Sequence, residues 1–330
     1  MRWGTHLMAT ATATATATGP GTETSGSQPG PALLDGAMGT ELIARGLDLS
    51  REAPETWVLE RPAVIREIHA AYVAAGAGIL QTCTFGATRP RLEHVGLGEE
   101  VAAVNREAVG LARAEAAGRP VLASLGPTGI DPFSPGAAAA MAAAYRQQIA
   151  ALAEAGVDGL HFETLCHPLE ATQAAAAARQ VAPRLPIILS ATYALGDHGF
   201  QTPLGVPLQA MTQALLAAAP DALGVNCSLE ARKMLGLVRQ LRELVDRAQA
   251  ETQARALALV VQPQGGPPEL DCRAPRRGPE VEEFVRGLRA ILDRGDLGVA
   301  MVGGCCGAGP AHIAALAAAL RRTGESPPPA

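Results

Sequence analysis

Aromatic residues and lysine are scarce in this chain. Phe, Trp and Tyr together make up 3% of its 330 residues, which leaves little material for an aromatic cage around a cationic ligand. The single lysine, Lys233, lies within a predicted helix. A Schiff-base aldolase needs a lysine near the end of a strand, so that class of enzyme is excluded.

Clustered positive charge and long apolar runs are also lacking. The formal net charge is -5 and the arginines are scattered singly over predicted helices, which excludes nucleic acid as a partner. No apolar run reaches the roughly 18 residues that a membrane helix needs, so we expect a soluble protein without a membrane partner. Six cysteines, two of them adjacent, do not resemble a secreted disulfide framework and indicate metal binding or catalysis in a reducing, cytoplasmic compartment.

Both ends of the chain have a composition that is poor in large apolar residues. Residues 1–31 contain an Ala-Thr alternation and a stretch rich in Ser, Gly and Pro, and residues 323–330 contain three consecutive prolines. We expect both ends to be disordered. The sequence therefore predicts one domain, from residue 32 to residue 322.

Between these ends, short β-branched or Leu-rich runs alternate with longer Ala-rich amphipathic stretches. This alternation is typical of parallel βα units. The predicted strands are Ala32 to Asp35, Ile79 to Thr84, Val121 to Leu125, Gly159 to Glu163, Ile187 to Tyr193, Ala222 to Asn226, Leu257 to Gln262 and Gly298 to Val302. Eight such units predict an α/β protein with a TIM (β/α)8 barrel, and a doubly wound open sheet is the alternative.

Reactive side chains fall at the ends of these predicted strands, where a TIM barrel carries its active site. They are Asp35, Cys83, Glu163, Cys227, Gln262, Cys305 and Cys306. The position of these residues therefore favours the barrel and predicts one site at its carboxyl-terminal mouth.

Three of the cysteines, Cys227, Cys305 and Cys306, lie in glycine-flanked segments that follow predicted strands. Three thiolates suit zinc, and a zinc ion with three protein ligands keeps one position open for a substrate. The same residues allow two other interpretations. A lone buried cysteine usually acts as a small apolar residue, and the glycines from Gly303 to Gly309 before a helix could form a phosphate site. The adjacent cysteine pair argues against both.

A zinc ion held by three thiolates is a poor electrophile but suits the binding of a substrate thiol, whose pKa it lowers. Thiol alkylation follows naturally from such a site. Asp35 and Glu163 can hold an ammonium group on the same substrate, and the backbone at Gly36 and Gly39 can approach a carboxylate. An amino-acid thiol fits these partners.

Six segments of the chain resemble the homocysteine S-methyltransferase family, over about Ala32 to Arg321. The segments are Asp35-Gly36-Ala37-Met38-Gly39-Thr40, Gln81 to Thr88, Leu125 to Gly129, Val157 to Thr164, Gly224 to Cys227 and Gly303 to Gly307. The resemblance implies a zinc-dependent barrel that methylates homocysteine to methionine. It also implies that Cys227, Cys305 and Cys306 are the zinc ligands and that Asp35 and Glu163 position the amino group of homocysteine.

Departures from the family pattern leave the methyl donor open. Cys83 stands where the methionine-synthase branch usually has Asn, and we interpret it as a small apolar filler. Asp197-His198-Gly199 has the wrong spacing for a cobalamin signature, so a corrin would need a separate subunit. Trp57 and Phe85 could contribute to a cage for a cationic donor, although Trp57 could equally cover the barrel mouth.

A protein that stores zinc, or senses redox state through the Cys305-Cys306 dithiol, is the alternative outside methyl transfer. This hypothesis gives Asp35 and Glu163 no role. The histidines show no metal-ligand pairing and are interpreted as surface or packing residues.

Overall fold

The structure, a computed structural model, describes residues 30–252, 256–266 and 279–322. The predicted disordered ends lie almost entirely outside these residues, so their disorder and the domain limits of 32 and 322 stay predictions. No helix in the described ranges combines the length and the apolar character that a membrane span requires.

Eight parallel strands form one sheet in the order β1-β10-β9-β8-β5-β4-β3-β2. A parallel bridge between Leu34 and Ile79 joins the two ends of this order and closes the sheet. The strands are β1 Ala32–Leu33, β2 Leu80–Gln81, β3 Val121–Leu125, β4 Gly159–Leu165, β5 Ile187–Ala191, β8 Ala222–Glu230, β9 Ala258–Gln264 and β10 Val299–Val302. The prediction of a TIM-like α/β barrel is confirmed.

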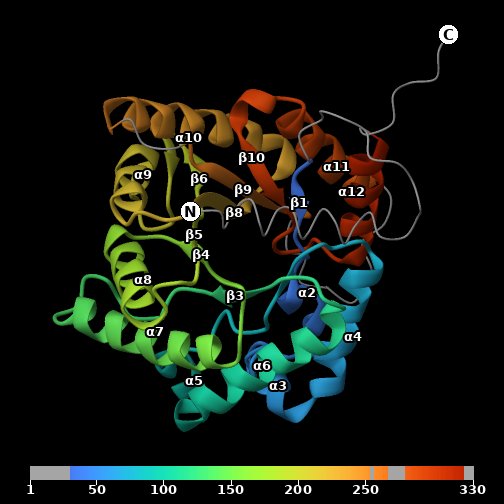
Figure 1. The fold of residues 1–330 in the computed structure, drawn as a ribbon, viewed down its shortest axis with the longest axis vertical. Helices are drawn as coiled ribbons and strands as arrows, with labels where there is room; N and C mark the ends of the chain where they lie inside the picture. The colour runs from blue at the N-terminus through green and yellow to red at the C-terminus, as the bar shows by residue number, and fades with distance from the viewer. Residues whose placement is uncertain (1–29, 253–255, 267–278, 323–330) are drawn as a thin grey trace.

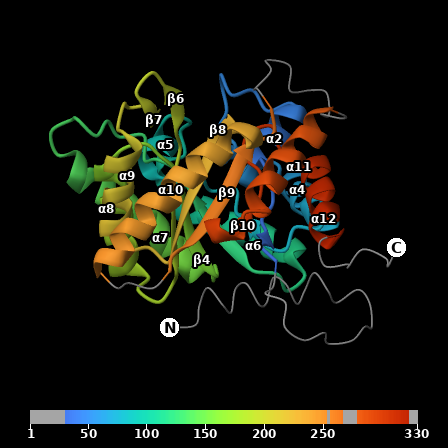
Figure 2. The same cartoon turned by 90° about the horizontal axis from the view of Figure 1, so that it is seen from above.

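Helices surround the strands on the outside (Figures 1 and 2). They are α2 Met38–Ala44, α3 Thr56–Glu60, α4 Pro62–Ala74, α5 Arg89–Glu93, α6 Val101–Ala116, α7 Ala137–Glu154, α8 Pro168–Val181, α9 Leu208–Ala217, α10 Ala231–Thr252, α11 Pro279–Leu292 and α12 Pro310–Arg322, with two 3₁₀ turns at Gly98–Glu100 and Gly295–Leu297. Proline opens several of them because its missing N–H is not needed in the first turn. Gly76 and Gly156, with φ of 100° and 85°, follow α4 and α7, where a left-handed residue ends the helix.

A small antiparallel hairpin, β6 Ala194–Gly196 with β7 Gly199–Gln201, was not predicted. It leaves the barrel after β5, and its two-residue turn is Asp197-His198. Gly199 has a φ of 100°, a conformation that glycine adopts easily. The Asp197-His198-Gly199 segment is therefore part of a hairpin, and the Gly-Asp-His-Gly pattern was the local signal for it.

The barrel interior has an apolar lower layer and a polar upper layer, the upper one at the carboxyl ends of the strands. The lower layer is an apolar cluster to which six of the eight strands contribute, with Ile79 next to β2 and no residue from β4; its members are Ala32, Leu34, Ile79, Leu122, Ile188, Ala222, Val260 and Met301. At the level of the strand ends, the buried side chains are instead polar: Asp35, Gln81, Ser124, Glu163, Asn226 and Gln262. Successive side chains of a strand point alternately into and out of the barrel, and the last inward-pointing ones are polar. Polar groups therefore line the mouth, where a TIM barrel carries its active site.

Acid sensitivity is expected from one buried histidine on α4. His69 is fully buried, neither ring nitrogen has a hydrogen-bond partner, and burial lowers its pKa from 6.5 to about 4. A lowered pKa contributes stability above pH 6.5 that is lost as the pH falls towards 4. Between pH 7 and pH 4, the free energy of unfolding of His69→Leu should therefore fall by up to about 3 kcal/mol less than that of the wild type.

Urea unfolding at a series of pH values between 7 and 4 measures this effect. The exposed His94, changed to leucine, is the control and should follow the wild-type curve. If the free energy of unfolding depends on pH in the same way for the wild type and for His69→Leu, the prediction is wrong.

Candidate functional site

The structure brings together the three cysteines that the sequence singles out. Cys227 lies in the last part of β8, and Cys305 and Cys306 follow β10. Their sulfur atoms all lie within 4.8 Å of one another, and those of Cys227 and Cys306 are 3.5 Å apart. In the part of the chain that is described, these three residues form a group that could hold a metal ion.

The loop of Cys305 and Cys306 reaches this position because glycines allow close packing beneath it. A Cβ atom on Gly303 would lie 2.7 Å from Leu34 Cβ and 2.8 Å from the Asp35 carbonyl oxygen, and one on Gly304 would overlap Ala308. The Cys305 N–H donates to the Pro263 carbonyl at 2.8 Å. Gly303 and Gly304 are therefore needed because a side chain would not fit between the loop and its neighbours. A left-handed backbone is not the reason, since only Gly307 in this loop has a positive φ.

The thiol group of Cys227 differs in acidity from the other two. Hydrogen bonds from Cys305 and Cys306 lower the pKa of Cys227 to about 3. The interaction with Cys227 in turn raises the pKa of Cys306 to about 11 and that of Cys305 well above its usual range. The cluster alone thus favours a single thiolate, and three thiolates require a cation among them. Thiolate is the donor that a soft divalent metal ion prefers, so the donor set fits such an ion.

Two buried carboxyl groups lie at the same end of the barrel. Asp35 follows β1 and is 2% exposed, and Glu163 in β4 is 8% exposed. Gln81 of β2 connects them, because its backbone N–H donates to Asp35 Oδ2 at 2.8 Å and its Nε2 donates to Glu163 Oε1 at 2.6 Å. Gln262 Nε2 donates to Gln81 Oε1 at 2.8 Å and so fixes the orientation of that amide.

The two carboxyl groups lack a compensating positive charge. Burial raises the pKa of Asp35 well above its usual range, and the nearby Glu163 adds to the shift. Burial, with the charge of Cys227, raises the pKa of Glu163 to about 7. Asp35 Oδ1 is buried without a hydrogen-bond partner, and among the described residues neither acid forms an ion pair. A cationic ligand would satisfy both groups.

Comparison with known proteins identifies the family. Residues 32–320 match the family model described as homocysteine S-methyltransferase. The chain belongs to the homocysteine S-methyltransferase family. Within it, the chain is 32% identical over 309 residues to the homocysteine S-methyltransferase of Escherichia coli K12, covering 87% of this chain and 94% of that protein.

A second relative is much longer. The methionine synthase of Mycobacterium tuberculosis is 28% identical over 303 residues, which cover 87% of this chain but 24% of that protein. This chain therefore spans about a quarter of the length of that relative. Among solved structures, the metallated form of the E. coli homocysteine methyltransferase MmuM superposes with a TM-score of 0.69 at 29% identity, covering 88% of this chain and 96% of that one.

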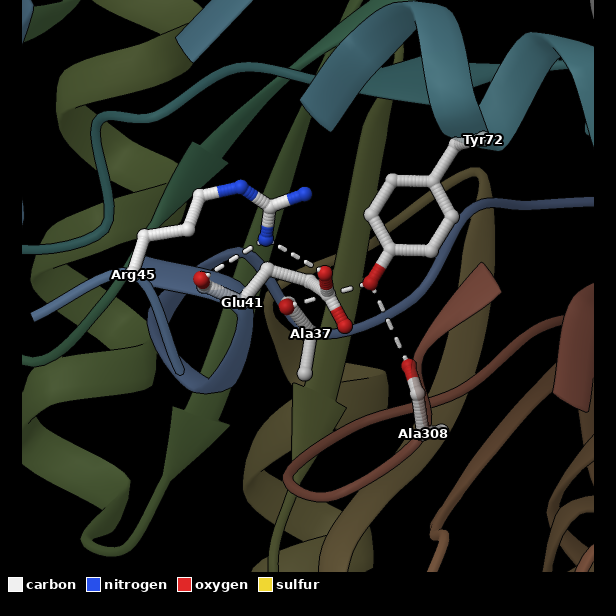
Figure 3. Close-up of polar contacts among 5 residues, drawn as sticks. All are labelled: Ala37, Glu41, Arg45, Tyr72 and Ala308. Atoms are coloured by element: carbon white, nitrogen blue, oxygen red, sulfur yellow. Dashed lines mark hydrogen bonds and ion pairs between the residues drawn. The ribbon is translucent and has the colours of Figure 1, made fainter. Parts of the chain in front are cut away.

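Gly36, which follows Asp35, belongs to a loop that is tied to the cysteine loop. A Cβ atom at Gly36 would overlap the Ala308 carbonyl oxygen, and the Ala37 N–H donates to that oxygen at 3.0 Å. The Tyr72 hydroxyl lies between the carbonyl oxygens of Ala37 and Ala308, at 3.1 and 3.3 Å, and the neighbouring Arg45 pairs with Glu41 (Figure 3). The segment that carries Asp35 and Gly36 thus also holds the loop of Cys305 and Cys306 in place through Ala308.

Trp57 and Cys83 have packing roles in the structure. Trp57 is fully buried, its indole N–H donates to Glu52 Oε1 at 3.0 Å, and the Arg61 guanidinium lies 4.2 Å from its ring centre. It does not offer a free face to a ligand. Cys83 is 3% exposed and belongs to the large hydrophobic core that also contains Trp57. Burial raises the pKa of its thiol well above the usual range. Both observations agree with its interpretation as a small apolar filler.

Three residues around the site have no role that the sequence predicts: Gln81, Thr164 and Asn226. Gln81 occupies a position in a central strand where an apolar residue would be usual, and this was the available signal. Thr164 and Asn226 form hydrogen bonds with each other, although β5 lies between their strands. No pattern within either segment predicts that contact.

Proposed function

We propose that this chain is a zinc-dependent methyltransferase that transfers a methyl group to the sulfur of homocysteine and produces methionine. The observation that carries this proposal is the proximity of a three-thiol cluster to two buried acids without a counter-charge. Homocysteine offers a thiol for the first and an ammonium group for the second. Membership of the homocysteine S-methyltransferase family supports the same substrate.

We assign Cys227, Cys305 and Cys306 as the zinc ligands. Zinc bound there would supply a positive charge that lowers the pKa of a substrate thiol and leaves one position open to it. The glycine-rich loop keeps Cys305 and Cys306 beside Cys227.

Asp35 and Glu163 are assigned to the ammonium group of homocysteine. The free Oδ1 of Asp35 is a ready acceptor, and Gln81 holds both carboxyl groups in place. Gly36 is assigned to the substrate site through its backbone, which lies directly beside Asp35. Orientation of the substrate by its ammonium group directs its sulfur to the thiol cluster.

In the transfer itself, a bond forms between the substrate sulfur and the methyl carbon. The bond between that carbon and the donor breaks, and its electron pair leaves with the donor. The thiol proton goes to solvent before the transfer. Because Trp57 is enclosed, an aromatic cage built on it is not part of this proposal, and the donor is left to experiment.

The alternative, a zinc-storing or redox-sensing protein built on Cys305 and Cys306, is not favoured. It does not explain why two acids lie buried and without a counter-charge beside the thiols. We therefore propose a catalytic barrel spanning residues 32 to 322. We further propose that it works in the cytoplasm, where its thiols stay reduced.

Assay of the purified, zinc-loaded protein with homocysteine and a panel of donors tests the proposal. The panel contains S-methylmethionine, S-adenosylmethionine, glycine betaine, and methylcobalamin or methyltetrahydrofolate with a separate corrinoid subunit. Methionine should form with at least one of them. If none of them gives methionine while zinc stays bound, the proposed function is wrong.

Binding of homocysteine should release close to one proton per site near pH 7. A free thiol has a pKa of about 8.5 and must lose its proton to bind a metal ion. Titration calorimetry in buffers of different ionisation enthalpy measures the release. Methionine, which has the same ammonium and carboxylate groups but no thiol proton, is the control for protons exchanged by Glu163. Equal release by the two ligands would show that the thiol does not reach the metal.

A further inference from the structure

A buried amide, that of Asn226, connects two strand ends that are not neighbours in the sheet. Asn226 belongs to β8 and is 1% exposed, whereas its partner Thr164 belongs to β4, and β5 lies between these strands. The Thr164 N–H donates to Asn226 Oδ1 at 2.9 Å, and Asn226 Nδ2 donates to Thr164 Oγ1 at 2.9 Å. The pair therefore spans β5 and links the two strands on either side of it.

The same amide group also contacts the thiol cluster. Asn226 Nδ2 donates to the sulfur of Cys305 at 3.8 Å. With this contact both N–H bonds of the amide are used, and its oxygen is taken by Thr164. The orientation of the amide is thus fixed, since a rotation by 180° would direct its NH2 group at the Thr164 N–H, which can only donate.

The hydrogen bonds between Asn226 and Thr164 join two segments whose backbone conformation is unusual. Thr164 and Cys227 have φ of 60° and 58°, in the left-handed region that residues other than glycine rarely adopt, least of all a β-branched residue such as Thr164. Strand pairing also shifts at both places, between Phe162 and Leu165 on β4 and between Asn226 and Glu230 on β8. Such irregularities redirect side chains and persist where the surroundings determine them.

The residues next to the pair in the sequence belong to the candidate site. Glu163 precedes Thr164, and Cys227 follows Asn226. We propose that Asn226 is a positioning residue that holds the Cys305 sulfur through an N–H···S hydrogen bond and, through Thr164, fixes the thiol cluster relative to Glu163. This inference rests on the proposed function in assigning the cluster to a metal ion.

Asparagine suits this role because it combines an acceptor for the Thr164 N–H with donors for a hydroxyl oxygen and a sulfur. Aspartate has the same shape but would direct a second oxygen at the sulfur. Hydrogen bonds to metal-binding groups orient them and reduce the charge they carry, and their loss weakens metal binding by about 10- to 100-fold.

The test uses cobalt(II) as a spectroscopic probe, so that its outcome does not depend on turnover. Asn226→Ala should lower the affinity for cobalt(II) by about 10- to 100-fold in competition with a chromophoric chelator, and it should shift the thiolate-to-cobalt charge-transfer band. Asn105→Ala removes another fully buried asparagine, on α6, whose amide donates to Ala87 and Val101. This control should lower stability without changing the band.

Variants at Thr164 separate positioning from general damage. Thr164→Ser keeps the hydroxyl and should retain the wild-type cobalt(II) affinity and spectrum, whereas Thr164→Val removes the acceptor and should reproduce the effect of Asn226→Ala. If Asn226→Ala does not fold, Asn226→Asp and Thr164→Val are judged by the same measure.

An unchanged band and a cobalt(II) affinity within about threefold of the wild type, in the folded Asn226 variant and in Thr164→Val, would overturn the inference. Absence of cobalt(II) binding to the wild type would overturn it as well. If the expected cobalt(II) results are obtained but no donor gives methionine, the inference stands and the proposed function fails.

Discussion

Replacing Cys227, Cys305 or Cys306 with serine is expected to remove most of the zinc and to abolish methyl transfer. A neutral hydroxyl is a poor substitute for a thiolate, and the remaining two sulfurs leave the ion with too few strong ligands. Since loss of a hydrogen bond to a ligand already costs about 10- to 100-fold in affinity, loss of a ligand should exceed that. Zinc content after dialysis and methionine formation are the measurements.

The control is Cys166→Ser, in the loop that follows β4. Cys166 is partly exposed, lies outside the three-cysteine group and donates to the Thr164 carbonyl at 3.2 Å, a contact that a serine hydroxyl can keep. Zinc content and activity should stay near those of the wild type. Full zinc occupancy in any of the three ligand variants would show that the corresponding cysteine is not a ligand.

Glu163→Gln is expected to weaken homocysteine binding by about 1.5–3 kcal/mol, the usual contribution of a hydrogen bond to a charged group. This corresponds to about a 10- to 150-fold higher Kd. Glutamine keeps the oxygen that accepts from Gln81 at 2.6 Å, so the geometry of the site and its zinc content should be preserved. Calorimetry with homocysteine on the zinc-loaded variant measures the change.

A matched exchange on the surface, Glu154→Gln on α7, controls for the loss of one negative charge. Glu154 pairs with Arg106 and its side chain is 62% exposed, so homocysteine affinity should not change. If Glu163→Gln binds homocysteine as tightly as the wild type does, Glu163 does not hold the ammonium group.

Local pattern was sufficient to predict the barrel and the placement of its reactive groups. The strand Val121–Leu125 was predicted with its observed limits, because an apolar run between a helix-ending glycine and a Gly-Pro turn leaves little choice. The three cysteines were predicted to lie together because parallel strands present their carboxyl ends at one edge. That prediction required no knowledge of side-chain contacts.

Contacts between distant segments could not be predicted in this way. The pairing of Asn226 with Thr164 depends on left-handed backbone at Thr164 and Cys227, a conformation that neither residue type favours in isolation. The role of Gly303 and Gly304 in close packing became visible only with Leu34 and Ala308 in place. Thr164 and Leu34 lie far in the sequence from the residues that they contact, and Ala308 meets Gly304 only through the turn of the loop.

The short strands where the barrel closes place two demands on Asp35. β1 and β2 each have two residues, and the N–H of Gln81 donates to the carboxylate of Asp35 instead of to a backbone carbonyl. The acid assigned to the substrate thereby also completes the sheet. We therefore expect a substitution of Asp35 to disturb the closure of the barrel as well as substrate binding.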